Sequence, residues 1–141
     1  MSLPLADMIC FSLYSATHAM QASYKPLLDQ IGLTYPQYLV LTALWQQDAQ
    51  SVGQIGQSLQ LESNTLTPLL KRMEAQGLLT RTRSNEDERQ VKISLTEAGR
   101  ALESRAAHIP GCILEKSGMT LPELTALRDQ INRLRGQLRS T

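Results

Sequence analysis

Two cysteines are the residues whose type could do chemistry in this chain. Cys10 lies in the stretch MICFSLYSATHAM at residues 8–20, and Cys112 lies in IPGCILEK at residues 109–116. A cysteine can be a buried packing residue, half of a disulfide, a metal ligand, or a reactive thiol that works as its thiolate. The spacing of the two leaves these four uses open.

Cys10 shares a helical face with Tyr14 and His18, at steps of four residues. That pattern could suggest a metal site or a cysteine hydrolase. The chain has only two histidines, His18 and His108, and no close Cys-x-x-Cys pair, so the ligand set for a metal is poor. No glycine-rich turn supplies an oxyanion site for a Cys–His pair. We therefore expect no metal, no cofactor and no enzymatic activity.

The start of the chain bears on the redox state of these thiols. Residues 1–11 carry one acid and no base, unlike the start of a secretory signal peptide. The chain has no apolar run of about 20 residues, so we expect no membrane segment. These observations predict a cytoplasmic protein with reduced cysteines at rest.

The net charge of +1 says little about a partner, but the charges are unevenly distributed. Residues 1–70 carry one base and four acids, and residues 71–141 carry thirteen bases and nine acids. The second half can therefore present a basic face to nucleic acid, beginning at Lys71 and Arg72. A solvated surface of mixed charge explains these charges equally well.

Helix start and stop signals recur along the 141 residues, a length that suits one domain. A long first helix is expected from about Pro4, with Pro26 kinking or restarting it and Gly32 ending it. At three expected helix starts, a Ser or Thr precedes a Gln or Glu by three positions, which is the spacing of a capping box. The three pairs, each opening a helix, are Thr34 with Gln37, Ser51 with Gln54, and Thr120 with Glu123.

A helix over about residues 63–76 is expected after the short helix at 52–59, which makes a helix-turn-helix. Its start lies between Ser63 and Thr67, because Pro68 is easiest to accept near the first turn. Gly77 is placed to terminate it in a left-handed conformation. Its apolar face consists of Leu66, Leu69, Leu70 and Met73.

The hydrophobic period then changes to two, in LLTRTR at residues 78–83 and in VKISL at residues 91–95. This predicts two short strands joined by the polar hairpin loop SNEDERQ. Thr96 caps a further helix, which the residues from Ile109 to Cys112 interrupt or end. The predicted fold is mainly α with a small β-hairpin wing, an α+β winged helix-turn-helix.

A winged helix-turn-helix suits double-stranded DNA, because its second helix fits the major groove and the wing reaches the minor groove. Arg89 at the hairpin tip is expected in the minor groove, with Asp87 holding one of the wing arginines in place. A solvated surface is again the alternative. The candidate DNA-binding residues are Ser63, Asn64, Thr65, Thr67, Pro68, Lys71, Arg72, Arg81, Arg83, Asp87 and Arg89.

The last helix carries apolar residues at intervals of three and four, which make a short heptad seam. Such a seam can pack on its own domain, or it can form a dimer interface. Its position at the end of a small protein favours the dimer. The seam residues are Leu124, Leu127, Ile131, Leu134 and Leu138.

Three stretches resemble the MarR-type regulators, and two of them resemble the organic-hydroperoxide-sensing OhrR branch. NEDERQVKISLTEAGRAL at residues 85–102 resembles the wing signature of the whole family. TLTPLLKRMEAQGLLTR at 65–81 and SYKPLLDQIGLTYPQYLVLTALW at 23–45 resemble the branch. The resemblance implies a homodimer that represses from a pseudo-palindromic operator. Residues 34–100 would bind DNA, and residues 1–33 and 101–141 would form the dimerisation helices of the single 1–141 chain.

The resemblance also implies roles for the cysteines. Cys10 matches the family's peroxide-sensing thiol, and Tyr24 and Tyr35 match the tyrosines that hydrogen-bond this sulfur across the dimer. Cys112 resembles a resolving cysteine, which implies a disulfide with Cys10 of the other subunit after oxidation to sulfenic acid. An organic hydroperoxide is the implied inducer. A small external thiol could resolve Cys10 instead, and Cys112 could be a buried apolar residue.

Three classes of function therefore remain. The favoured one is a redox-switched repressor. The second is a MarR-type repressor released by a phenolic or lipophilic ligand, with the cysteines incidental. The third is a thiol peroxidase, which the winged domain disfavours because an enzyme has no use for it.

Overall fold

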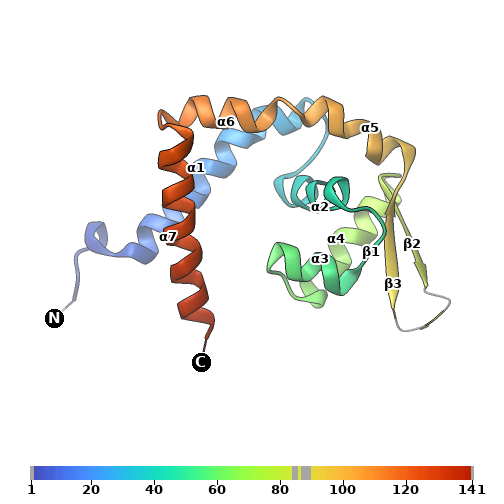
Figure 1. Cartoon of the computed structure of the whole chain (residues 1–141), viewed down its shortest axis with the longest axis horizontal. Helices are drawn as coiled ribbons and strands as arrows, with labels where there is room; N and C mark the ends of the chain where they lie inside the picture. The colour runs from blue at the N-terminus through green and yellow to red at the C-terminus, as the bar shows by residue number, and fades with distance from the viewer. Residues whose placement is uncertain (1, 84–85, 87–89, 141) are drawn as a thin grey trace. The chain divides into compact units, whose positions relative to one another are not determined.

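The computed structural model describes residues 2–83, 86 and 90–140. The chain divides into two compact units, Met1–Ala107 and His108–Thr141. The predicted fold, mainly helical with a β-hairpin, is confirmed. The elements labelled in Figure 1 are η1 (Leu5–Asp7), α1 (Ile9–Asp29), α2 (Tyr35–Gln46), β1 (Gln50–Ser51), α3 (Val52–Leu59), α4 (Ser63–Ala75), β2 (Leu79–Arg83), β3 (Val91–Leu95), α5 (Glu97–Ala106), α6 (Ile109–Ser117) and α7 (Leu121–Arg139).

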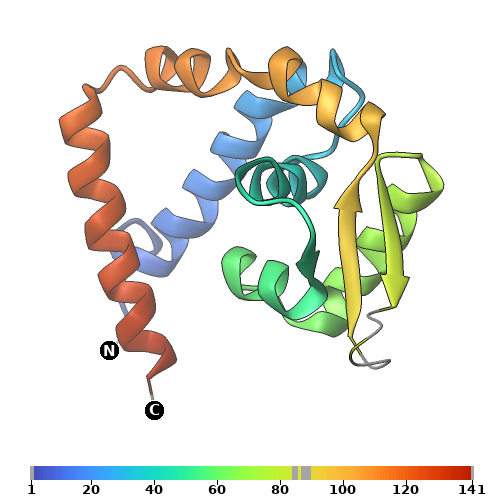
Figure 2. The same ribbon diagram turned by 45° about the vertical axis from the view of Figure 1, so that its right-hand side comes forward.

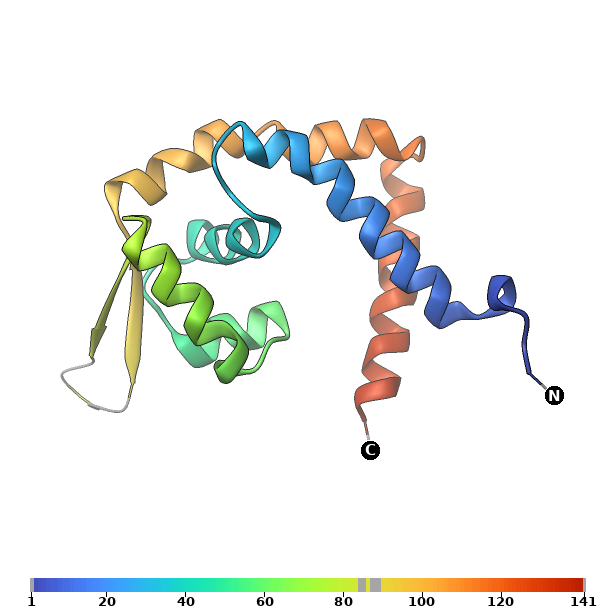
Figure 3. The ribbon, with the colours of Figure 1, turned by 180° about the vertical axis from the view of Figure 1, so that it is seen from behind.

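Helix α1 runs without interruption, and Figure 3 shows it as one continuous helix. Pro26 therefore does not restart it. Pro26 lies in the last turn, where a missing N–H removes one intrahelical hydrogen bond and the helix still continues. Gly32 has φ +70°, the left-handed conformation expected where this segment ends. Pro4 precedes the short 3-10 helix η1, which is separate from α1.

Helices α2, α3 and α7 each begin with the predicted capping box. In α2, Gln37 N–H donates to Thr34 Oγ1 at 3.3 Å, and Thr34 N–H donates to Gln37 Oε1 at 3.1 Å. Thr96 caps α5 as predicted, because its hydroxyl oxygen accepts from Gly99 N–H at 3.1 Å. These caps pair backbone donors that a helix start leaves open.

Strands β2 and β3 form the predicted antiparallel hairpin, with Leu79 opposite Leu95. A third strand, β1, pairs with the other edge of β3, so the strand order is β1-β3-β2 (Figure 2). The prediction of only two strands missed β1. Its two residues, Gln50 and Ser51, are too few to show an alternating pattern.

Helix α4 begins at Ser63, the earliest of the predicted starts, so Pro68 lies in its second turn. The helix tolerates the bond lost at Pro68 because its apolar face is buried against α2, α3 and the sheet. Gly77 ends the segment with φ +78°, and Leu78 N–H donates to the Met73 carbonyl at 3.0 Å. Completely buried side chains of this core include Val40, Leu41, Leu44, Ile55, Leu66, Leu70, Met73 and Ile93.

The interruption predicted at residues 109–112 lies two residues earlier, at Ala107 and His108. Residues 109–112 instead form the first turn of α6. Pro110 is the second residue of α6. The N–H groups of the first turn have no acceptor within the helix, so a proline is favourable there and Pro110 helps to start α6. Across the described residues, no helix has both the length and the apolar character that a membrane crossing requires.

Candidate redox and DNA-binding sites

Cys10 is the second residue of α1, and it is exposed. Apolar and aromatic side chains near it are exposed too: 64% of Ile9 and 62% of Tyr14. Large apolar side chains are usually withdrawn from water. This end of α1 therefore has the composition of a covered surface, although its side chains are exposed.

Tyr24, Tyr35 and Tyr38 form a ring cluster between α1 and α2. The ring centroids of Tyr24 and Tyr35 are 5.0 Å apart, and those of Tyr24 and Tyr38 are 5.8 Å apart. Burial, with the other two phenols, raises the pKa of Tyr24 from 10.0 to about 12. Burial also raises the pKa of Tyr35 and Tyr38. All three hydroxyls therefore stay protonated at neutral pH and can donate hydrogen bonds to an anion.

The structure does not bring Cys10 to these tyrosines within one chain. Residues 10 and 24 lie on the same uninterrupted helix. At the rise of an α-helix they are about 21 Å apart. The Cys10 thiol therefore does not reach the tyrosine cluster of its own chain.

A hollow of about 270 Å³ lies beside Tyr35, between the second half of α1 and the start of α2. Lys25 and Asp29, joined by an ion pair of 3.1 Å, stand on its α1 side. The hollow is large enough for a small organic group. Its lining residues are Gln21, Lys25, Leu28, Asp29, Leu33, Thr34, Tyr35 and Pro36.

The possible metal or hydrolase face on α1 has a simpler explanation. The rings of Tyr14 and His18 are 4.3 Å apart, so His18 packs on a tyrosine. Within the described residues, no three His, Cys, Asp or Glu side chains gather into a group that could hold a metal ion.

Cys112 belongs to the second compact unit, where it is the fourth residue of α6. Its side chain is partly exposed, and its N–H donates to the His108 carbonyl at 3.2 Å. The predicted break next to Cys112 is thus a regular helical turn. The irregularity that could permit movement lies before α6, at Ala107 and His108.

The predicted base-reading and phosphate-binding residues lie on the exposed side of α4, opposite its buried leucines. Thr67 is the exception, because it is partly buried. The chain therefore presents one continuous polar helix face to solvent, with two bases toward its end. The exposed members are Ser63, Asn64, Thr65, Pro68, Lys71 and Arg72.

The wing arginines differ in their surroundings. Arg81 N–H donates to Glu74 Oε2 at 2.9 Å, and Arg81 Nη1 lies 4.0 Å from Glu74 Oε1. The sequence pattern does not reveal Glu74 as a partner of Arg81, because the two meet only after the turn at Gly77 brings β2 back along α4. Arg83 is exposed on β2. The predicted sites Asp87 and Arg89 lie outside the described residues.

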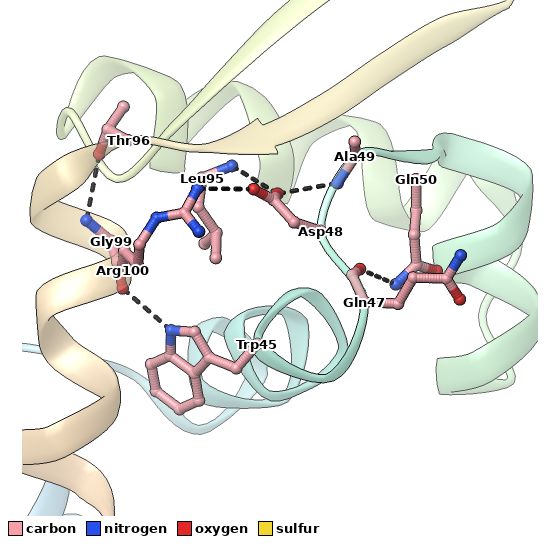
Figure 4. Close-up of polar contacts among 9 residues, drawn as sticks. All are labelled: Trp45, Gln47, Asp48, Ala49, Gln50, Leu95, Thr96, Gly99 and Arg100. Atoms are coloured by element: carbon pink, nitrogen blue, oxygen red, sulfur yellow. Dashed lines mark hydrogen bonds and ion pairs between the residues drawn. The ribbon is translucent and has the colours of Figure 1, made fainter.

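A polar network joins α2 and the loop after it to β3 and α5, as Figure 4 shows. Asp48 Oδ1 accepts from Leu95 N–H at 2.9 Å, and Asp48 Oδ2 accepts from Arg100 Nη2 at 2.9 Å. Trp45 Nε1 donates to the Gly99 carbonyl at 2.9 Å. The wing and α5 are thus tied to the end of α2 and to the loop that follows it. The partners are 47 or more residues apart in sequence, so no local pattern could reveal them.

Comparison with known proteins assigns the family. A family model described as "Transcriptional regulator SarA/Rot" matches residues 22–105. The organic hydroperoxide resistance transcriptional regulator of Bacillus subtilis (strain 168) is 49% identical over 129 residues, covering 92% of this chain and 88% of that protein. The chain belongs to the SarA/Rot family of MarR-type winged-helix transcriptional regulators. The predicted MarR and OhrR resemblance is thereby confirmed.

Solved structures of AbfR resemble this regulator closely. The structure of reduced AbfR bound to DNA has a TM-score of 0.81 and 35% identity, covering 97% of this chain and 96% of that one. The structure of disulfide-formed AbfR has a TM-score of 0.64 and 37% identity, covering 92% and 91%. The winged-helix fold is therefore shared with proteins solved on DNA and in a disulfide form.

Proposed function

We propose that this regulator is a dimeric, DNA-binding repressor that organic hydroperoxides switch off by oxidising Cys10. The observation that carries the proposal is the placement of Cys10. It is exposed at the start of α1 beside exposed apolar side chains, and Tyr24, the nearer of the phenols that suit its thiolate along the chain, lies about 21 Å further along the same helix. A second copy of the chain supplies both the cover and the phenols.

The exposed apolar residues support a dimer. None of the residues of α7 is buried, although its seam is apolar. Ile9 and Phe11 on α1 are likewise exposed. Burying these side chains between two copies would give the hydrophobic stabilisation that a homodimer needs.

The redox step follows ordinary thiol chemistry. The Cys10 thiolate attacks the outer oxygen of the hydroperoxide, the O–O bond breaks, and the alcohol leaves with a proton. Cys10 is thereby oxidised to sulfenic acid and the peroxide is reduced. The thiolate of Cys112 from the other chain then attacks the Cys10 sulfur, which forms the disulfide and releases the sulfenic oxygen as water. Tyr24 and Tyr35 donate hydrogen bonds that stabilise the attacking thiolate.

The output of the switch is operator binding. The polar face of α4 would read bases in the major groove, while Lys71 and Arg72 hold phosphates and Arg89 enters the minor groove. Two copies must present their α4 helices at a fixed spacing to bind both half-sites. A disulfide that turns the winged domains would break this spacing. The DNA-bound and disulfide forms of AbfR support such a cycle.

Intact mass tests the proposal without an operator. Reduced protein receives one equivalent of an organic hydroperoxide, and its mass is measured under denaturing, non-reducing conditions. We expect a doubled mass that is lost on reduction and absent in Cys112→Ser. A monomer with one added oxygen would agree with Cys10 as the sensor but would exclude the resolving role of Cys112. An unchanged mass would contradict the redox switch.

The hollow beside Tyr35 favours one alternative, a repressor released by a phenolic or lipophilic ligand. Cys10→Ser separates the two. The redox proposal expects this variant to bind its operator and to ignore organic hydroperoxide. Release of the variant by hydroperoxide would contradict the role of Cys10.

A further inference from the structure

The side chain of Gln37 makes a contact that its capping box does not require. Its Oε1 accepts from Thr34 N–H at 3.1 Å, and its Nε2 donates to Gln76 Oε1 at 2.9 Å. Only 4% of Gln37 is exposed. Gln37 lies in the first turn of α2, and Gln76 is the C-cap of α4. One buried amide therefore joins the start of α2 to the end of the candidate recognition helix.

The same turn of α2 carries Tyr35, which belongs to the tyrosine cluster. Tyr35 is the first residue of α2, and its ring lies 5.0 Å from that of Tyr24. The hollow is lined by Thr34, Tyr35 and Pro36. The capping box ties Thr34 to Gln37, and Tyr35 lies between them in the same turn. We therefore expect a displacement of Tyr35 to displace Gln37 as well.

The apolar face of α4 is buried, and hydrogen bonds that involve side chains also reach its end. Besides the amide of Gln37, Arg81 N–H donates to Glu74, and the Thr96 hydroxyl donates to the Gly77 carbonyl at 2.6 Å. Of these three contacts, the one from Gln37 comes from α2. The two others come from β2 and from the start of α5, which belong to the wing side.

We propose that the Gln37–Gln76 hydrogen bond is the positioning contact that transmits the state of the tyrosine cluster to the recognition helix. This inference rests on the proposed function. In the reduced dimer, the thiolate of a second copy would hold the Tyr35 hydroxyl, and the bridge would fix the end of α4. Oxidation removes that thiolate, releases the turn, and lets α4 shift through the same bridge.

Three variants separate this coupling from a merely structural role. Gln76→Ala removes the acceptor and leaves the capping box of α2 intact. Gln76→Glu keeps an acceptor oxygen for the Gln37 amide and should restore the coupling. Gln46→Ala is the matched control, because Gln46 is an exposed glutamine at the end of a helix, on the last residue of α2.

The test is a double-mutant cycle with Tyr35→Phe. The probe is a DNA duplex selected from a random-sequence library by the reduced wild-type protein. In the otherwise wild-type chain and in the Gln46→Ala control, we expect Tyr35→Phe to weaken DNA binding by about threefold to tenfold. This is the range expected for the loss of one hydrogen bond. In the Gln76→Ala background the same change should cost less than about twofold, and Gln76→Glu should restore the full effect. An effect of Tyr35→Phe that is equal in both backgrounds would overturn the bridge.

Repeating the titrations after one equivalent of cumene hydroperoxide separates the inference from the proposed function. If the hydroperoxide leaves DNA binding by the wild type unchanged, the redox switch is contradicted. The double-mutant cycle on reduced protein would still test whether the Gln37–Gln76 hydrogen bond couples Tyr35 to α4. Hydrogen exchange at the amides of residues 76–78 gives a readout without DNA. Tyr35→Phe should lower their protection in the wild type and not in Gln76→Ala, and equal loss in both would also overturn the bridge.

Discussion

Gly99 packs directly against the backbone of Leu78. A Cβ atom at position 99 would overlap the Leu78 carbonyl oxygen and lie 3.1 Å from its carbonyl carbon. The Gly99 carbonyl accepts from the Trp45 indole at 2.9 Å, so this one residue touches both the start of β2 and the end of α2. This packing is a physical reason for the glycine in the Leu-Thr-x-x-Gly stretch that follows β3.

Gly99→Ala should therefore lower the free energy of unfolding by about 1–3 kcal/mol, because backbone must shift to admit the methyl group. Urea unfolding followed by the fluorescence of Trp45, the single tryptophan, measures this at fixed protein concentration. Gly53→Ala is the control, since its Cβ would make an ordinary contact of 3.9 Å with Ser51 Oγ. Equal stability of the two variants would argue against the close approach.

Asp48→Ala should also destabilise the protein, by about 1–3 kcal/mol, because it leaves the Leu95 N–H and the Arg100 guanidinium without their acceptor. Asp29→Ala removes an exposed partner of Lys25 and should cost about 0.5 kcal/mol or less. The same urea titration compares them. A small effect at Asp48 would mean that water replaces the carboxylate.

Stability should fall at high pH because of Tyr24. Its pKa is raised from 10.0 to about 12 in the folded chain, so above pH 10 the unfolded chain loses this proton first. The folded state then binds more protons than the unfolded state, and the free energy of unfolding decreases between pH 10 and about 12. Tyr24→Phe should reduce this decrease in denaturant titrations across that range. An identical pH profile for the variant would assign the decrease to other groups.

Ile131→Glu should dissociate the proposed dimer, because it places a charge in the middle of the exposed apolar seam of α7. Sedimentation equilibrium measures the mass in solution. Asn132→Glu adds the same charge on the polar side of the helix and should leave the dimer intact. A wild-type protein that sediments as a monomer would refute the dimer itself.

Lys71→Gln should weaken binding to the selected duplex and to duplexes of other sequence by about the same factor, because a phosphate contact carries no base information. The plot of log affinity against log salt should lose about one unit of slope. Lys116→Gln, at an exposed residue of α6, has the same charge change and should keep the slope. An unchanged slope for Lys71→Gln would remove Lys71 from the DNA interface.

Local signals were enough to place most elements from the sequence. The capping boxes at Thr34, Ser51 and Thr120, and the left-handed Gly77, lie where the spacing predicted them. Each depends on interactions within four or five residues, so the pattern itself contains the information. One failure came where a distant partner decides the structure: the two residues of β1 are a strand only because they pair with β3.

The sequence by itself determined the candidate residues, because a thiol, a phenol or a guanidinium has the same chemistry wherever it lies. Only the tertiary structure decided their partners. It joined Arg81 to Glu74, Gln37 to Gln76 and Asp48 to Leu95. It also separated Cys10 from Tyr24 along one uninterrupted helix, so the proposed redox site needs a second chain. Such pairings depend on how distant segments pack, and no local spacing encodes that.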